Sequence, residues 1–143
     1  MPQPQTYATH VRYVPRYLAA LLVLMVHAVW ALADAVTGLS VASVRAAAVA
    51  VALVFIALYA RSFALRAQDR IIRLEMQLRL RELLPAELQS RVPEFTVDQL
   101  VALRFASDRE LPALAARVLQ EGLRDRKAIK LLVTDWKADD LRV

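Results

Sequence analysis

Hydrophobic positions form two long runs in the first part of the chain and a shorter, periodic pattern after them. The runs are YLAALLVLMVHAVWALADAV at residues 17–36 and VASVRAAAVAVALVFIALYA at residues 41–60. Each has about the 20 residues that an α-helix needs to cross a hydrocarbon core of roughly 30 Å. Only TGLS lies between them, with Gly38 as the expected turn. A link this short joins antiparallel neighbours, so we predict a transmembrane helical hairpin.

A cleaved signal peptide is the alternative interpretation of the first run. It fits poorly, because sixteen charge-free apolar residues lie far from the start of the chain and a second span follows at once. The second run leads into ARSFALRAQDRIIRLE, residues 60–75, without a Gly or Pro to end a helix. We therefore predict that the second span continues as a cytoplasmic helix to about Leu84.

This extension is basic and has two distinct faces. Residues 61–81 carry six arginines against Asp69 and Glu75. Arginines at the membrane surface favour contact with anionic lipid headgroups, and the expected contacts are Arg61, Arg66, Arg70 and Arg73. A second face has the alternating 3–4 spacing of a short coiled coil, and its residues are Ala64, Ala67, Ile71, Leu74 and Leu78. The alternatives are a solvated charged face and a stripe covered by the C-terminal part of the chain itself.

The flanking charges predict the orientation in the membrane. Arg12 and Arg16 precede the first span, and the arginines from Arg61 onward follow the second. The connecting loop offers Arg45 alone, offset by Asp34. Because positively charged flanks stay in the cytoplasm, we expect both termini inside.

The pattern after Leu84 predicts short helices. Pro85 and Pro93 mark a connector, and Thr96 with Gln99 three residues later is a capping-box start for a helix to about Phe105.

Two further helices are expected beyond this one. Ser107 or Asp108 caps the first of them, which has an amphipathic stripe and ends at Gly122. The last helix starts near Asp125. The predicted core positions of the two helices are Leu111, Leu114, Ala115, Val118, Leu119, Ile129, Leu132, Val133 and Trp136. A core of this size is marginal, so packing on the preceding rod or on another subunit would stabilise it.

Four blocks carry a family resemblance: YVPRY, ARSFALRAQDRIIRLE, TVDQLVALRFASDRELPALAARV and IKLLVTDWKADDLR. They resemble a family of bacterial two-span membrane proteins of unknown function. A histidine often follows the YVP-x-Y block in that family, whereas Leu18 stands there in this chain. The resemblance implies membership over the full chain and a multi-pass protein of the bacterial inner (cytoplasmic) membrane. It implies no activity, cofactor or substrate.

Composition and the lack of known motifs argue against several classes of protein. The chain has no cysteine, and a hydrophobic fraction of 58% exceeds the roughly 45–50% of soluble domains. We find no phosphate-binding loop, metal-ligand spacing or catalytic set, so we expect no enzyme, catalytic residue, metal or cofactor. The sequence pI is about 10.1, but residues 82–143 carry ten Lys/Arg against eleven Asp/Glu, so we expect no nucleic-acid partner.

His27 is the intramembrane polar candidate, with Trp30 and Asp34 on roughly the same face. Two interpretations of His27 remain open. It is a functional group, such as a haem ligand, a quinone-site hydrogen bond or a proton relay, or it is a neutral imidazole hydrogen-bonded to a neighbouring helix or a backbone carbonyl. In the second span, Ala46 with Ala50 and Ala48 with Ala52 have the small-xxx-small spacing that permits close helix approach, and we expect one such pair inside the hairpin.

These patterns predict an all-α protein with a two-span hairpin, a second span continuing into a cytoplasmic helix, and a small C-terminal helical bundle. The expected parts are an N-terminal cytoplasmic tail (1–16), the hairpin (17–60), a juxtamembrane basic amphipathic helix (61–84) and a cytoplasmic module (85–143). We expect a non-enzymatic membrane interaction protein, either a self-assembling scaffold or an accessory subunit of a larger membrane complex. The alternative is a small oligomeric transport or pore protein that uses the hairpin and His27.

Overall fold

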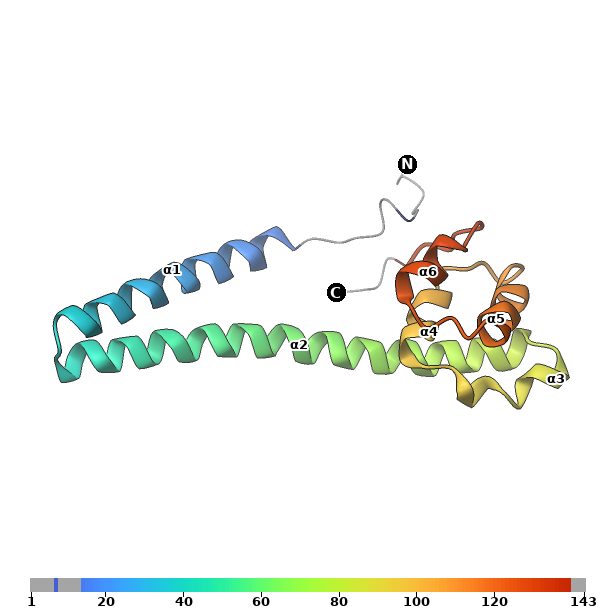
Figure 1. Cartoon of the computed structure of the whole chain (residues 1–143), viewed down its shortest axis with the longest axis horizontal. Coiled ribbons are helices and arrows are strands. Elements are labelled where there is room, and N and C mark those ends of the chain that lie inside the picture. Colours follow the sequence, from blue (N-terminus) through green and yellow to red (C-terminus); the bar gives the residue numbers. More distant parts are fainter. Residues whose placement is uncertain (1–6, 8–13, 140–143) are drawn as a thin grey trace. The chain divides into compact units, whose positions relative to one another are not determined.

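The structure is a computed structural model, and it describes residues 7 and 14–139. The described chain is all-helical, which confirms the predicted fold class (Figure 1). Its elements are α1 (Pro15–Thr37), α2 (Val41–Leu83), α3 (Ala86–Gln89), a 3₁₀ turn η1 (Val92–Glu94), α4 (Val97–Leu103), α5 (Leu111–Gln120) and α6 (Arg126–Leu131). Arg12 and most of the predicted tail 1–16 lie outside the described residues.

Helix α2 contributes to two compact units. One unit is Arg12–Leu65 and the other includes Arg66–Val143, so the division falls within the helix, a few residues beyond the predicted limit at residue 60. The 43 residues of α2 are continuous, as predicted from the absence of a breaker at the end of the second run. Each unit is described below by itself.

Helices α1 and α2 are both long and apolar enough to cross a membrane. The 23 residues of α1 span about 34 Å at 1.5 Å per residue, close to the thickness of a hydrocarbon core. Pro15 occupies the first turn of α1, where a missing N–H costs no helical hydrogen bond. At the start of α2 the Ser40 and Ser43 hydroxyls each accept a hydrogen bond from the other residue's N–H, at 3.1 Å in both cases.

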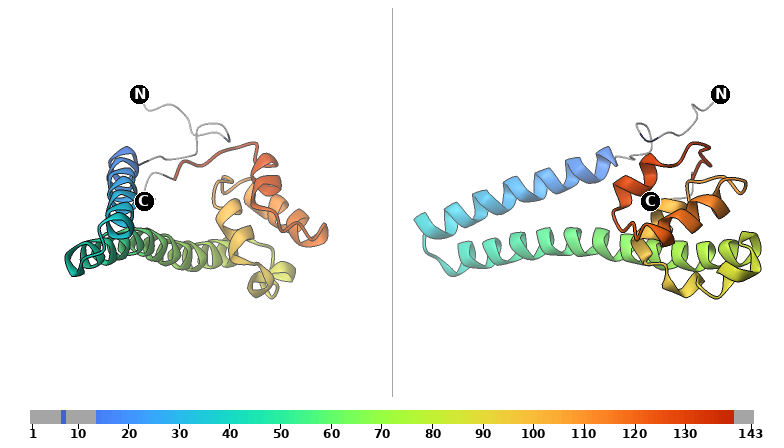
Figure 2. Two further views of the ribbon diagram at one scale, coloured as in Figure 1. Left: turned by 60° about the vertical axis from the view of Figure 1, so that its left-hand side comes forward. Right: turned by 45° about the vertical axis from the view of Figure 1, so that its right-hand side comes forward.

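The two helices form an antiparallel hairpin held by small side chains (Figures 1 and 2). Ala28 and Ala31 of α1 are buried against Ala47 and Ala50 of α2. Alanine at these positions lets the two backbones approach closely. Near the other end of the pair, the Tyr17 hydroxyl donates to the carbonyl oxygen of Ala57 at 3.2 Å.

The contact contains only one residue of the predicted pair Ala46 and Ala50. Ala50 is almost fully buried, but Ala46 is exposed and takes no part in the contact with α1. Ala47 fills the position instead, because Ala47, Ala50 and Val54 follow the 3–4 spacing of one helix face. A four-residue spacing of small residues alone does not show which face of α2 contacts α1.

The second unit is a small bundle on the C-terminal part of α2. Ile72, Met76, Leu80 and Leu84 are four residues apart and are all buried in its core. Helices α4, α5 and α6 supply most of the remaining core, and α4 packs against both α5 and α6 (Figure 1). The largest fully buried side chains include Phe105, Leu100 and Leu111.

Local signals in the sequence explain the short helices. The capping box is present: the Thr96 hydroxyl accepts from the Gln99 N–H, and the Gln99 side chain accepts from the Thr96 N–H. Gln99 also donates to the carbonyl of Leu123 at 2.7 Å, which explains a buried amide. After α5, Gly122 has φ of 61° and the Leu123 N–H bonds to the Val118 carbonyl, which is the predicted glycine stop.

The last predicted helix is shorter than expected. Asp125 caps α6 as predicted, with its carboxylate accepting from Ala128 N–H, but the helix ends at Leu131 and does not reach Trp136. Beyond α6, Trp136 forms an antiparallel bridge with Ala106, and its ring lies 5.0 Å from that of Phe105. Here the Ser107 N–H donates to the Asp135 carbonyl at 2.9 Å and the Lys137 N–H donates to the Phe105 carbonyl at 2.7 Å, in place of further helical hydrogen bonds. The connector after Leu84 also contains α3 and η1, which we did not predict.

Candidate interaction surface

Helix α2 carries two apolar faces beyond residue 66, and only one is covered. The covered face is the one in the core: Ile72, Met76 and Leu80 are 6%, 3% and 0% exposed. The other face is made by Ile71, Leu74 and Leu78, which are 56%, 63% and 67% exposed. At about 100° per residue the two sets lie on opposite sides of the helix.

We call Ala64, Ala67, Ile71, Leu74 and Leu78 the α2 stripe. All five are exposed, so the alternative in which the chain's own C-terminal module covers them does not hold for the described structure. The module packs on residues that the 3–4 pattern did not single out. The α2 stripe therefore remains available to another chain.

The predicted headgroup contacts fall into two environments. Arg66, Arg70 and Arg73 are exposed on one side of α2. Arg61 is half-buried, and its guanidinium lies 5.9 Å from the centre of the Tyr17 ring, a cation–π distance. Lipid contact by these arginines stays a prediction.

An aromatic ladder lies before Arg66 in α2 and was not predicted. The Phe55 and Tyr59 rings are 6.5 Å apart, and the Tyr59 and Phe63 rings are 5.7 Å apart. Tyrosine gathers where a span leaves the hydrocarbon for the headgroups. The i, i+4, i+8 spacing of the three aromatic residues is the sequence signal from which the ladder could have been predicted. The ladder marks the end of the apolar part of α2.

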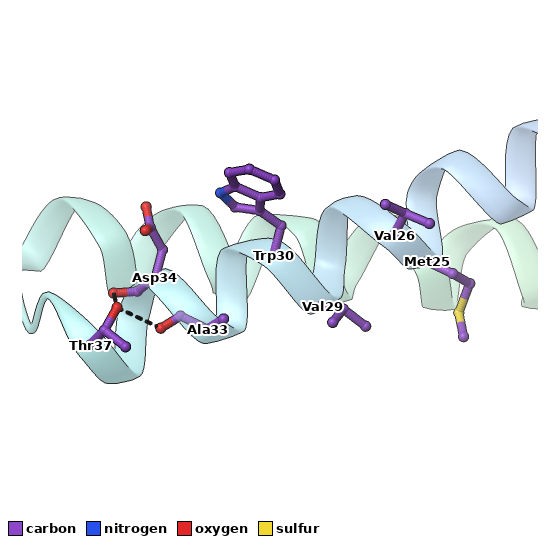
Figure 3. A pocket seen from close by; sticks show the side chains of 7 residues that line it. All are labelled: Met25, Val26, Val29, Trp30, Ala33, Asp34 and Thr37. Carbon is purple, nitrogen blue, oxygen red and sulfur yellow. Dashed lines mark hydrogen bonds between the residues drawn. The ribbon is translucent and has the colours of Figure 1, made fainter.

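The outer face of α1 holds a shallow, open apolar depression (Figure 3). Trp30 and Asp34 project from the same side of the helix, as predicted, and Thr37 donates to the Ala33 carbonyl at 2.9 Å. The residues that line the depression are Met25, Val26, Val29, Trp30, Ala33, Asp34 and Thr37. His27 is exposed and does not face the contact with α2. The structure thus brings His27 no partner helix from within the hairpin.

Charged residues gather where the FASDRELP segment meets the segment after α6. Arg79 of α2, whose side chain is 16% exposed, donates to the Asp108 carboxylate at 2.7 Å and to the carbonyls of Arg104 and Ala106 at 3.3 and 2.6 Å. The hydrogen bond from Arg79 to the Asp108 carboxylate, followed by the charge of Arg79, lowers the pKa of Asp108.

A second set of contacts fixes the other side of this junction. The Glu110 carboxylate accepts hydrogen bonds from the N–H groups of Thr134 and Asp135, both at 2.9 Å, and Arg104 pairs with Asp139 at 3.1 Å. The Asp135 carboxylate lies 3.8 Å from the Arg109 guanidinium, so both Asp135 and Asp139 pair with arginines distant in sequence. Within residues 14–139, no three His, Asp or Glu side chains gather in a group that would hold a metal ion.

Comparisons with known proteins place the chain in one family. The sequence model described as a family of unknown function (DUF6526) matches residues 1–143. No curated protein and no solved structure matches the chain. The full-length match confirms the resemblance that the four sequence blocks carry.

Proposed function

This chain belongs to that family of unknown function, and from this premise we propose a role on the basis of its own surfaces. It is a non-enzymatic, membrane-anchored interaction protein. The hairpin anchors it, and the α2 stripe binds another protein chain beside the membrane. Its partner is either a further copy of the chain or a subunit of a larger membrane complex.

The observation that supports this role is the second apolar face of α2. A helix that packs on a single small module needs one apolar face, which Ile72, Met76 and Leu80 already provide. The exposed apolar residues at 3–4 spacing on the opposite face are not covered by any part of the chain that the structure describes. A contiguous patch of this kind is typical of a protein–protein contact.

We further propose that the chain lies in the inner membrane of a bacterium with both termini in the cytoplasm. The positively charged flanks Arg16 and Arg61 support this orientation. Arg66, Arg70 and Arg73 would then meet anionic headgroups, each contributing on the order of 1 kcal/mol near the surface. The aromatic ladder fits the same placement.

Cysteine labelling tests the orientation, because the chain has no cysteine of its own. Leu39 lies in the turn between the two helices and is 85% exposed, and Ala138 is exposed in the module. In intact bacterial cells, Leu39→Cys should react with a membrane-impermeant maleimide, whereas Ala138→Cys should react only after the cells are opened. The reverse pattern would overturn the orientation.

The interaction role is tested by the mass of the complex extracted from native membranes in a gentle detergent. We expect a species larger than the 16.0 kDa chain, and we expect Ile71→Asp with Leu74→Asp to release the chain from it. Leu131→Asp is the matched control, because Leu131 is 63% exposed but lies on α6. His27→Leu should also leave the mass unchanged. An unchanged mass in the double variant would contradict the proposal.

A further inference from the structure

The spacing of the α2 stripe fits a coiled-coil heptad, in which positions a and d face the partner helix. With Ile71 and Leu78 at a and Leu74 at d, the earlier alanines Ala64 and Ala67 also fall at a and d. The residues buried by the module occupy the remaining outer positions: Ile72 at b, Met76 at f and Leu80 at c. The a and d positions are therefore the ones that the fold leaves open for a second helix.

Charged residues flank the stripe with opposite signs on its two sides. Arg70 precedes Ile71 and occupies position g, and Glu75 follows Leu74 and occupies position e. Both are exposed, and neither forms an ion pair within residues 14–139. In a parallel pair of helices, position g of one chain lies beside position e five residues later on the other. Arg70 and Glu75 are five residues apart.

The flanking charges thus complement those of an identical helix, but only in one direction. Two parallel copies in register form two symmetric Arg70–Glu75 pairs, one on each side of the contact. An antiparallel arrangement places g beside g and e beside e, which brings charges of equal sign together. The stripe is self-complementary in the parallel arrangement and self-repelling in the other.

Membrane insertion requires the same direction. All copies of one chain cross the bilayer in the same orientation, so a symmetric pair has its two-fold axis along the membrane normal and its α2 helices parallel. The residues of the stripe nearest the membrane, Ala64 and Ala67, are small and allow the two helices to approach closely. Anchoring in one membrane also raises the effective concentration, which allows a contact of about two heptads to form.

We infer that the partner at the α2 stripe is a second copy of this chain, parallel and in register, with each Arg70 beside Glu75 of the other copy. In this pair Arg70 binds the partner, and the proposed headgroup contacts are left to Arg61, Arg66 and Arg73. This inference rests on the proposed function and names its partner. Each copy would keep its module on the opposite face of α2, so pairing requires no rearrangement of the module core.

Disulfide cross-linking of single-cysteine variants tests the geometry. Ile71→Cys, Leu74→Cys and Leu78→Cys, each oxidised in isolated native membranes, should all give dimers of twice 16.0 kDa. Arg73→Cys is the control, since Arg73 is exposed on the same helix but away from the stripe. An antiparallel pair would cross-link strongly at only one of the three positions. That result, or equal cross-linking at Arg73, would overturn the inference.

Charge exchange tests the specificity. Arg70→Glu and Glu75→Arg should each weaken self-association, because both variants place like charges together. Co-expressed with different tags, the two variants should form mixed dimers in several-fold preference to either self-dimer, because both pairs are then complementary. The matched control is Arg73→Glu, since Arg73 is exposed at position c, away from the contact. A mixture without preference for mixed dimers would refute the pairing.

The results separate this inference from the proposed function. Suppose that Ile71→Asp with Leu74→Asp releases the chain from a complex with a different protein, and that no stripe cysteine cross-links copies to each other. The inference of a second copy as partner is then wrong, and the proposed interaction role stands. If the double variant changes neither the mass nor the cross-linking, both are wrong. Cross-linking at all three stripe positions, lost in the double variant, supports both.

Discussion

Two leucines on one helix, Leu78 and Leu80, should respond very differently to the same substitution. Both lie in the part of α2 that carries the module, two residues apart. Leu80 is fully buried in the core, whereas Leu78 is 67% exposed on the α2 stripe. Replacing each by alanine removes the same atoms from the same kind of backbone. Any difference in stability therefore reports the face that each residue occupies.

The expected difference is large compared with the stability of the unit. A buried Leu→Ala change costs about 2–5 kcal/mol, because the lost apolar burial adds to the cavity left behind. Leu80→Ala should fall in that range. At Leu78 most of the side chain is already in solvent, so the loss should stay below about 1 kcal/mol. A unit of this length has about 4–11 kcal/mol in total at roughly 0.05–0.15 kcal/mol per residue.

Trp136 provides the assay. Its ring packs 5.0 Å from Phe105 in the core, and Trp30 is the only other tryptophan of the chain. In a Trp30→Phe background, urea unfolding in an excess of detergent micelles can be followed by Trp136 fluorescence, with the copies diluted into separate micelles. Equal losses for Leu80→Ala and Leu78→Ala would refute the assignment of one face to the core and the other to a partner.

Three further changes probe the junction and the turn after α5. Arg79→Met should cost the module about 2–4 kcal/mol in the same urea assay, because two carbonyls lose their donor, whereas Arg73→Met should cost little. Because the folded pKa of Asp108 is lowered by Arg79, its stabilisation is present above the unfolded pKa, about 3.9, and is lost as the pH falls through the folded value. Asp108→Asn should reduce this acid sensitivity when unfolding is compared at about pH 5 and pH 3. Gly122→Ala should lower the free energy of unfolding by about 1 kcal/mol from the positive φ alone, since an added Cβ meets no atom within 4 Å.

Sequence reasoning succeeded where one local signal determines the structure. The length of the apolar runs predicted α1 and the hairpin, and the absence of a breaker after Ala60 predicted the continuity of α2. The Thr96–Gln99 capping box and the Gly122 stop were both predicted because each depends on residues that are close in sequence.

It failed where long-range contacts choose between local options. The 3–4 pattern in α2 identified Ile71 and Leu74 as an apolar face but could not show that Ile72 and Met76 form a second one. We predicted Trp136 to be helical because its spacing from Leu132 fits one helix face. In the structure Trp136 instead forms a bridge with Ala106 beyond the end of α6. Arg79 has no distinguishing sequence signal among its neighbouring arginines. Only the fold brings it to two carbonyls and Asp108.

The pairing of Ala106 with Trp136 also has a consequence for the order of biosynthesis. The hairpin is complete once residue 60 has been made, but the module cannot close until residue 136 has followed. At about 5–20 residues per second, translation of that interval takes roughly 4–15 s. Within this time Leu80 and Phe105 are made before Trp136, the residue that completes their core. Newly made copies therefore pass through a stage in which the hairpin is complete and the module is not.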